Sequence, residues 1–187
     1  MNKFMAMGLI ILVIVLSFVV SNFIKNPQLS MGDVGAKEAT YLGEGLFFLW
    51  DEKTVVKMDQ QGDFEIGQRF VYEGEGEDIE IMEKTDRKTG EKMDLEIAVE
   101  VNAKTDDTVK LIDVREPGEF DSGHVPGAIN IPLGSILGSK EFSKDDVLIL
   151  YCRSGARSAT AQKALEREGY YVIDAGGIIY YRGEIER

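Results

Sequence analysis

Residues 147–168 read VLILYCRSGARSATAQKALERE, an apolar run followed by a short polar loop and a helix-forming stretch. The run from Val147 to Tyr151 is typical of a buried strand, and it ends abruptly at Cys152. The stretch from Ser158 to Glu168 has helical spacing, with a serine at its start and Gly169 just after its end. The segment therefore predicts a buried strand, a loop that holds the only cysteine of the chain, and a helix.

The position of Cys152 favours a reactive thiolate. Backbone N–H groups converge between the end of a strand and the start of a helix, where the helix dipole is positive. Arg153 and Arg157 add positive charge, which lowers the pKa of a nearby thiol. The common alternative, a small buried apolar cysteine, does not account for two arginines and a Ser-Gly-Ala turn beside it. The loop therefore predicts a nucleophilic or sulfur-carrying cysteine that faces an anionic substrate.

The second half of the chain alternates short strands with helical stretches, which predicts a parallel sheet covered on both faces. The β-rich runs are Lys110–Val114, Ala128–Ile131, Val147–Tyr151 and Tyr171–Asp174. In such sheets the functional site lies beyond the carboxyl ends of the strands. Asp113, Arg115 and Cys152 all follow strand ends, so we expect them at one edge of the sheet.

Several motifs in this half resemble the signature of the rhodanese (sulfurtransferase) domain family. They are LIDVRE at 111–116, EF at 119–120, GHVPGAINIP at 123–132, CRSGARS at 152–158 and AGGI at 175–178. Tyr181 stands where the family commonly has tryptophan. The resemblance covers about the last half of the chain and implies an α/β fold, a rhodanese-like parallel sheet flanked by helices over residues 94–187.

The resemblance also implies a sulfurtransferase that carries sulfur as a persulfide on Cys152 and needs neither a metal nor an organic cofactor. The donor is then a small sulfur anion such as thiosulfate or a protein persulfide, and the acceptor is a thiol or cyanide. The loop residues that would bind the substrate are Arg153, Ser154, Gly155, Ala156, Arg157 and Ser158. The two arginines would hold the sulfonate end of the donor, and the loop amides would cradle the anion.

Asp113, Arg115 and His124 are predicted to support the site rather than to touch the substrate. Asp113 either accepts N–H groups of the cysteine loop or simply ends a strand. Arg115 and Glu119 lie four apart, a spacing that favours a pair between them. His124, the only histidine, is predicted to fix a turn, with general-base catalysis as the alternative.

Two other functions remain open. Phosphatases that resemble this fold place five residues between the cysteine and the arginine, whereas four separate Cys152 from Arg157, so phosphate fits less well. A non-enzymatic, membrane-tethered docking or sulfur-carrier module is the second alternative. The intact cysteine and loop favour the enzyme.

The stretch from Phe4 to Ile24 contains no charged residue and is long enough to cross a bilayer as a helix. A cleaved signal sequence ending near Val19-Val20-Ser21 is the alternative, but its apolar region is usually shorter than this run. We therefore predict a single-pass transmembrane helix at residues 4–24 in the cell membrane. Lys3, Lys25 and Lys37 give only a weak preference for soluble domains outside the cytoplasm, and the opposite orientation stays open.

Residues 25–41 are predicted to be a tether, and residues 42–93 a small antiparallel β-rich domain. Leu95–Val101 alternates apolar and acidic residues, which predicts a strand of either this domain or the next one. The sequence between residues 42 and 93 shows no recognisable set of catalytic residues, and its carboxylates are predicted to form a solvent-exposed face.

The formal net charge of the chain is -12, so a nucleic-acid partner is not expected. Residues 26–104 carry 9 basic and 19 acidic side chains, and residues 105–187 carry 10 and 14. This change supports a domain boundary near residue 100. With one cysteine the chain has no intramolecular disulfide, and the sequence leaves its oligomeric state open.

Overall fold

A computed structural model describes residues 37–187 apart from 59–62, 76–77, 87 and 106. The predicted transmembrane helix at residues 4–24 lies outside the described residues. Within the described part, no helix is both long and apolar enough to cross a membrane.

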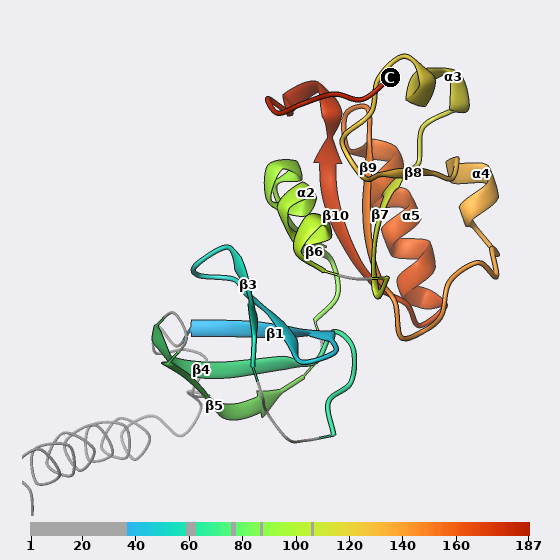
Figure 1. The fold of residues 1–187 in the computed structure, drawn as a ribbon. Coiled ribbons are helices and arrows are strands. Elements are labelled where there is room, and N and C mark those ends of the chain that lie inside the picture. Colours follow the sequence, from blue (N-terminus) through green and yellow to red (C-terminus); the bar gives the residue numbers. More distant parts are fainter. Residues whose placement is uncertain (1–36, 59–62, 76–77, 87, 106) are drawn as a thin grey trace, which may run out of the picture. The chain divides into compact units, whose positions relative to one another are not determined.

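The first part of this structure is a five-stranded antiparallel sheet with the order β3-β2-β1-β4-β5 (Figure 1). Its strands are β1 (Lys37–Gly43), β2 (Leu46–Leu49), β3 (Thr54–Lys57), β4 (Arg69–Glu75) and β5 (Asp78–Thr85). The antiparallel β-rich region predicted from the sequence is thus confirmed. Strand β1 begins at Lys37, inside the stretch predicted as a tether, because Lys37–Thr40 pairs with β4.

The second part is a five-stranded parallel sheet with the order β6-β10-β9-β7-β8. Its strands are β6 (Glu91–Lys92), β7 (Val109–Asp113), β8 (Ile129–Asn130), β9 (Val147–Cys152) and β10 (Tyr171–Gly177). The helices of this part are α2 (Leu95–Lys104), α3 (Pro117–Asp121), α4 (Leu133–Ile136), α5 (Ala156–Arg167) and the 3₁₀ helix η2 (Ile178–Tyr180). The parallel α/β sheet predicted for the second half is confirmed.

Strand β9 is the central strand, and all six of its residues are buried. Its side chains alternate between the two faces of the sheet, as the period of a strand requires. Ile149 and Tyr151 join a core with α2, whereas Leu148, Leu150 and Cys152 join a core with α5. Figure 1 shows α2 and α5 on opposite faces of this sheet. A continuous apolar run is therefore needed in β9, because both of its faces are covered.

Leu95–Val101 forms the first turns of α2, so the strand predicted there is wrong. Leu95, Ala98 and Val101 are buried and spaced by three, which places them on one helix face against the parallel sheet. The pattern LEIAVEV at 95–101 is compatible both with the two-residue period of a strand and with the 3.6-residue period of a helix. The sheet packed against the helix decides between them, because only the helix buries all three residues together.

The two sheets share side-chain packing. Leu42, Leu46 and Phe48 of the antiparallel sheet lie in the same core cluster as α2 and β9. A Cβ at Gly67 would overlap the ring of Tyr171 on β10. The predicted boundary between residues 93 and 94 stays a prediction, and the structure places β6, just before it, in the parallel sheet.

Candidate active site

Cys152 is the last residue of β9, at the carboxyl edge of the parallel sheet, and only 1% of its surface is exposed. Asp113 ends the neighbouring strand β7 at the same edge. The sheet thus brings together two of the residues that the sequence placed at strand ends, because parallel strands share one carboxyl edge. Arg115 lies two residues beyond Asp113 and is also buried.

The loop after Cys152 curls around its sulfur. Gly155 has a left-handed backbone (φ 98°) and is the N-cap of α5, which begins at Ala156 rather than at Ser158 as predicted. This conformation directs the Gly155 N–H to Sγ of Cys152 at 3.1 Å. Ser158, two residues into the helix and buried, has its hydroxyl 3.8 Å from the same sulfur. A helix start after the loop therefore surrounds the sulfur with donors.

These donors change the ionisation of Cys152. Burial by itself raises the pKa of the thiol, because desolvation disfavours the thiolate. The backbone N–H groups of Ser158, Ser154 and Gly155 and the hydroxyl of Ser158 lower it by more, so the pKa of Cys152 lies below its ordinary value. The loop therefore supplies what a nucleophilic cysteine needs, a stabilised thiolate in a site protected from water.

The loop rests on the glycine pair that ends β10. A Cβ at Gly177 would lie 2.6 Å from Cα of Ser154 and 2.7 Å from the carbonyl oxygen of Arg153. That carbonyl also accepts the N–H of Ile179 at 3.2 Å. Gly177 thus positions the cysteine loop by allowing two backbones to approach closely. Gly177 belongs to the motif AGGI at 175–178, but the sequence pattern did not predict a role for it. A glycine at the end of the strand that neighbours the cysteine strand is the signal that points to it.

Replacing Gly177 with alanine is expected to push the loop away from its position. We expect the second-order rate constant for sulfur uptake by Cys152 to fall about 100-fold, since a shift of about 1 Å at a reacting group has an effect of that size. The measurement is the rate of adduct formation with thiosulfate. Gly134→Ala is the matched control, because a Cβ there has no atom within 4 Å. An unchanged rate in the Gly177 variant would show that the loop does not depend on this contact.

Arg157 forms a two-hydrogen-bond ion pair with Glu119. Its Nη1 and Nη2 donate to Oε2 and Oε1 of Glu119 on α3 at 2.7 and 2.9 Å. The pairing of Arg115 with Glu119 that the sequence suggested is therefore wrong. Glu119 lies within a motif of the chain, but its partner is 38 residues away, so helical spacing could not identify it. The pair lowers the pKa of Glu119 to about 2, chiefly through the hydrogen bond from Arg157.

Arg115 pairs with Asp113 instead. Its Nε and Nη2 lie 2.8 and 2.6 Å from Oδ2 of Asp113, and Nη2 also donates to the carbonyl oxygen of Gly123 at 2.8 Å. Asp113 also accepts the backbone N–H of Arg115 at 2.9 Å. The Asp113 carboxylate is thus bound by Arg115 in the segment after β7, and it also interacts with the Tyr151 hydroxyl on β9. Asp113 and Arg115 hold the segment between β7 and α3 in place and bury no unpaired charge.

His124 forms an isolated β-bridge with Glu186, just after α3. Its Nδ1 is 3.1 Å from the carbonyl oxygen of Phe120, and its ring stacks on the Phe120 ring with centroids 3.7 Å apart. Its backbone exchanges two hydrogen bonds with Glu186 near the chain end. These contacts hold His124 against α3 and against the segment around Glu186. Tyr181 packs against the core, whereas Tyr180 is 68% exposed.

The remaining loop residues form the mouth of the site. Arg153, Ser154 and Ala156 are exposed around the buried Cys152. In the part of the chain that the structure describes, no cluster of three or more His, Cys, Asp or Glu side chains has the arrangement of a metal site.

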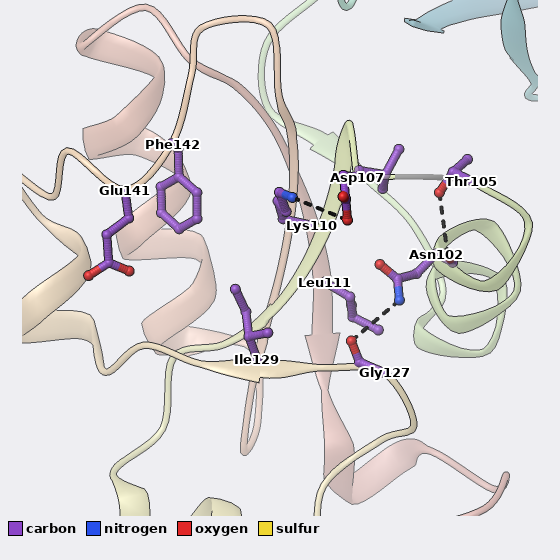
Figure 2. A pocket seen from close by; sticks show the side chains of 10 residues that line it. Asn102, Thr105, Asp107, Lys110, Leu111, Gly127, Ile129, Glu141 and Phe142 are labelled. Carbon is purple, nitrogen blue, oxygen red and sulfur yellow. Dashed lines mark hydrogen bonds and ion pairs between the residues drawn. The ribbon is translucent and has the colours of Figure 1, made fainter. Parts of the chain in front are cut away.

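A pocket of about 460 Å³ lies elsewhere on the second sheet (Figure 2). It is lined by the first half of β7 and by residues of α2, β8 and the segment before β9, including Asn102, Asp107, Lys110, Ile129 and Phe142. Figure 2 shows Lys110 facing Asp107 and Asn102 facing Gly127. None of the site residues predicted from the sequence lines this pocket.

The second half of the chain is similar to known proteins. The family model of the rhodanese-like domain matches residues 98–185. The putative sulfurtransferase YtwF of Bacillus subtilis is 35% identical over 89 residues, which cover 46% of this chain and 86% of that protein. Thiosulfate sulfurtransferase PspE of Escherichia coli is 39% identical over 71 residues, which cover 36% of this chain and 68% of that protein.

A putative mitochondrial thiosulfate sulfurtransferase of Schizosaccharomyces pombe is 42% identical over 79 residues. The match covers 35% of this chain and 56% of the yeast protein, which is less than two thirds of its length. The family match at residues 98–185 includes strands β7 to β10 and the loop that surrounds the sulfur of Cys152. On these grounds the chain belongs to the family of proteins with a rhodanese-like domain.

Proposed function

We propose that this protein is a sulfurtransferase that moves a sulfane sulfur through a persulfide on Cys152. The observation that carries the proposal is the sulfur of Cys152, buried at a strand end and hydrogen-bonded by the Gly155 N–H at 3.1 Å. The relatives named as sulfurtransferases support the same activity at the level of the family. The donor that we assign to it is a small sulfur anion such as thiosulfate or a persulfide, and the acceptor is a thiol or cyanide.

The reaction has two half-reactions. In the first, the Cys152 thiolate attacks the outer sulfur of thiosulfate, a new S–S bond forms, and sulfite leaves with the electrons of the broken S–S bond. In the second, a thiolate or cyanide attacks the terminal sulfur of the persulfide and releases the Cys152 thiolate. Each step exchanges one bond for another, so no external oxidant or reductant is required.

The loop contributes to both half-reactions. The N–H groups of Ser154, Gly155 and Ser158 stabilise negative charge on the thiolate and then on the persulfide. Arg153 is exposed at the mouth of the site, where it attracts an anionic donor. The phosphatase alternative is less well supported, because Arg157 follows Cys152 after only four residues and its two terminal nitrogens bind Glu119.

The test is intact-protein mass spectrometry of the full chain in detergent, before and after incubation with thiosulfate. We expect a gain of one sulfur atom, about 32 Da, that cyanide or a reductant removes. Because Cys152 is the only cysteine, the adduct has one possible thiol site. No gain from thiosulfate, from polysulfide or from a protein persulfide, with the thiol shown to be reduced, would overturn the proposal in favour of a docking module.

The proposal extends to the membrane. We infer from the uncharged run at residues 4–24 that a single transmembrane helix anchors the enzyme in the cell membrane, with its soluble part outside the cytoplasm. The test is fractionation of cells into membrane and soluble material, combined with protease accessibility of the intact cells. Recovery of the full-length chain in the soluble fraction would contradict the anchor.

Removing the hydroxyl of Ser158 is expected to raise the pKa of Cys152, because that hydroxyl favours the thiolate. Only the thiolate reacts with iodoacetamide. Ser158→Ala therefore lowers the alkylation rate at pH values below the pKa of Cys152 and leaves the rate unchanged at high pH. At neutral pH we expect about a threefold decrease, the effect of one modest hydrogen bond. Ser154→Ala is the matched control, since Ser154 acts through its backbone N–H, which alanine keeps. Equal pH profiles for both variants would exclude the hydroxyl as a donor to the sulfur.

A further inference from the structure

The carboxylate of Glu119 binds the guanidinium of Arg157, the cation that would otherwise be available to an anionic sulfur donor. Both terminal nitrogens of Arg157 are bound by Glu119, and the two side chains are 30% and 33% exposed. Arg157 also interacts with the sulfur of Cys152, so the pair lies beside the reacting atom and is partly open to solvent. Glu119 is itself held at the start of α3 by a capping box with Glu116. Because the pKa of Glu119 is about 2, the carboxylate is ionised at every physiological pH.

This pair changes the charge that an incoming anion meets. The loop has two arginines, but Glu119 neutralises Arg157, and Arg115 is paired with Asp113. Arg153 is the remaining cation of the loop, and it is exposed to solvent, where its attraction is screened. Bidentate pairing also takes up the fork of donors with which Arg157 would bind a sulfonate.

The donors of this reaction class differ in charge. Thiosulfate carries two negative charges and must approach a thiolate, which carries a third. A persulfide of an uncharged thiol carries at most one, and that charge lies on the sulfur that the loop amides are placed to receive. A site with one neutralised arginine therefore penalises the dianion more than the persulfide.

We propose that Glu119 is a specificity-determining residue that disfavours dianionic donors and directs the site toward persulfides of uncharged or weakly charged thiols. This inference rests on the proposed sulfurtransferase function. The transfer from such a donor balances without a co-reactant. The Cys152 thiolate attacks the outer sulfur of R–S–S⁻, the new S–S bond forms on Cys152, and the thiolate R–S⁻ leaves with the electrons of the old bond.

The experiment compares two donors on the full-length protein and on Glu119→Gln. The donors are thiosulfate and the persulfide of N-acetylcysteine methyl ester, whose organic part carries no charge. Glutamine keeps one acceptor oxygen for Arg157 but removes the negative charge. Glu116→Gln is the matched control, because it makes the same change in the same capping box, whereas the carboxylate that binds both terminal nitrogens of Arg157 is that of Glu119.

The expected result is a change in donor preference. In Glu119→Gln, kcat/KM for thiosulfate rises about tenfold relative to kcat/KM for the persulfide, mostly through a lower KM for thiosulfate. Tenfold corresponds to about 1.4 kcal/mol. The pH profile of Cys152 alkylation moves to lower pH, since Arg157 also interacts with the sulfur of Cys152 and no longer shares its charge with a carboxylate. Glu116→Gln leaves both readouts as in the unaltered protein.

Two results would overturn the inference. The first is an unchanged donor ratio in Glu119→Gln with normal sulfur uptake, which would leave the sulfurtransferase function intact and remove the role of Glu119. The second is a loss of activity with both donors together with a shift of the alkylation profile to higher pH, which would show that Glu119 only supports the loop. A failure of the proposed function itself looks different, because the unaltered protein would then accept sulfur from neither donor.

Discussion

Cys152→Ser is expected to abolish sulfur uptake, with a decrease of at least about 1,000-fold in the rate of adduct formation. Serine is nearly the same size, and its oxygen can accept the Gly155 N–H as the sulfur does at 3.1 Å. A hydroxyl is not ionised near neutral pH, however, and it cannot form the S–S bond on which the transfer depends. Because the chain has no second cysteine, no other thiol can replace it.

The measurement is the mass increase after incubation with thiosulfate or with an alkyl persulfide, made in parallel on Cys152→Ser and on the unaltered protein. Thermal unfolding is the control for folding. The substituted hydroxyl keeps a donor, so we expect a stability change of only about 1 kcal/mol. Sulfur transfer that persists in the folded serine variant would rule out the persulfide mechanism.

Glu91→Ala is expected to lower the free energy of unfolding by about 3–5 kcal/mol. Nη2 of Arg69, on β4, lies 2.5 and 2.7 Å from the two carboxylate oxygens of Glu91, on β6, and both side chains are only 5% exposed. The pair therefore joins the antiparallel sheet to the parallel sheet. Removing Glu91 leaves a buried guanidinium whose other neighbours, Glu38 and the Trp50 ring, compensate only part of its charge.

Equilibrium urea unfolding of the full chain measures this effect. Lys53→Ala is the control, because it removes an ion pair with Asp94 that is 61% and 68% exposed, for which we expect less than about 1 kcal/mol. The double variant Arg69→Met with Glu91→Leu is expected to recover most of the lost stability, since it leaves no unpaired charge. A Glu91→Ala protein as stable as the control would show that water reaches this pair and solvates Arg69.

The buried pair has a second consequence for the site. Gln162 of α5 donates to the backbone carbonyl oxygen of Glu91 at 2.8 Å and to that of Val172 at 3.1 Å. Helix α5 is the helix whose start forms the cysteine loop. The edge strand β6 is thus tied to the antiparallel sheet by its side chain and to α5 by its backbone. The antiparallel sheet therefore helps to hold the helix that carries the site.

Local patterns in the sequence predicted much of the second half. The apolar run of β9, the glycine after α5 and the loop that holds Cys152 are each readable from neighbouring residues, because strand burial, helix ends and helix-start amides are local properties. The same reasoning failed for Leu95–Val101, where the pattern fits two periods. It also failed for Arg115 and Glu119, whose helical spacing suggested a contact that neither residue makes.

The sequence by itself therefore determined the alternation of strands β7 to β10 with helix α5 and the carboxyl-edge position of Cys152, and it predicts a reactive thiolate there. Only the tertiary structure decided that Arg157 is neutralised by Glu119, that Gly177 packs beneath the loop and that Arg69 meets Glu91. Each of these contacts joins residues at least 20 positions apart. Their partners are selected by the packing of whole elements, and short-range spacing carries no information about which distant side chains that packing brings together.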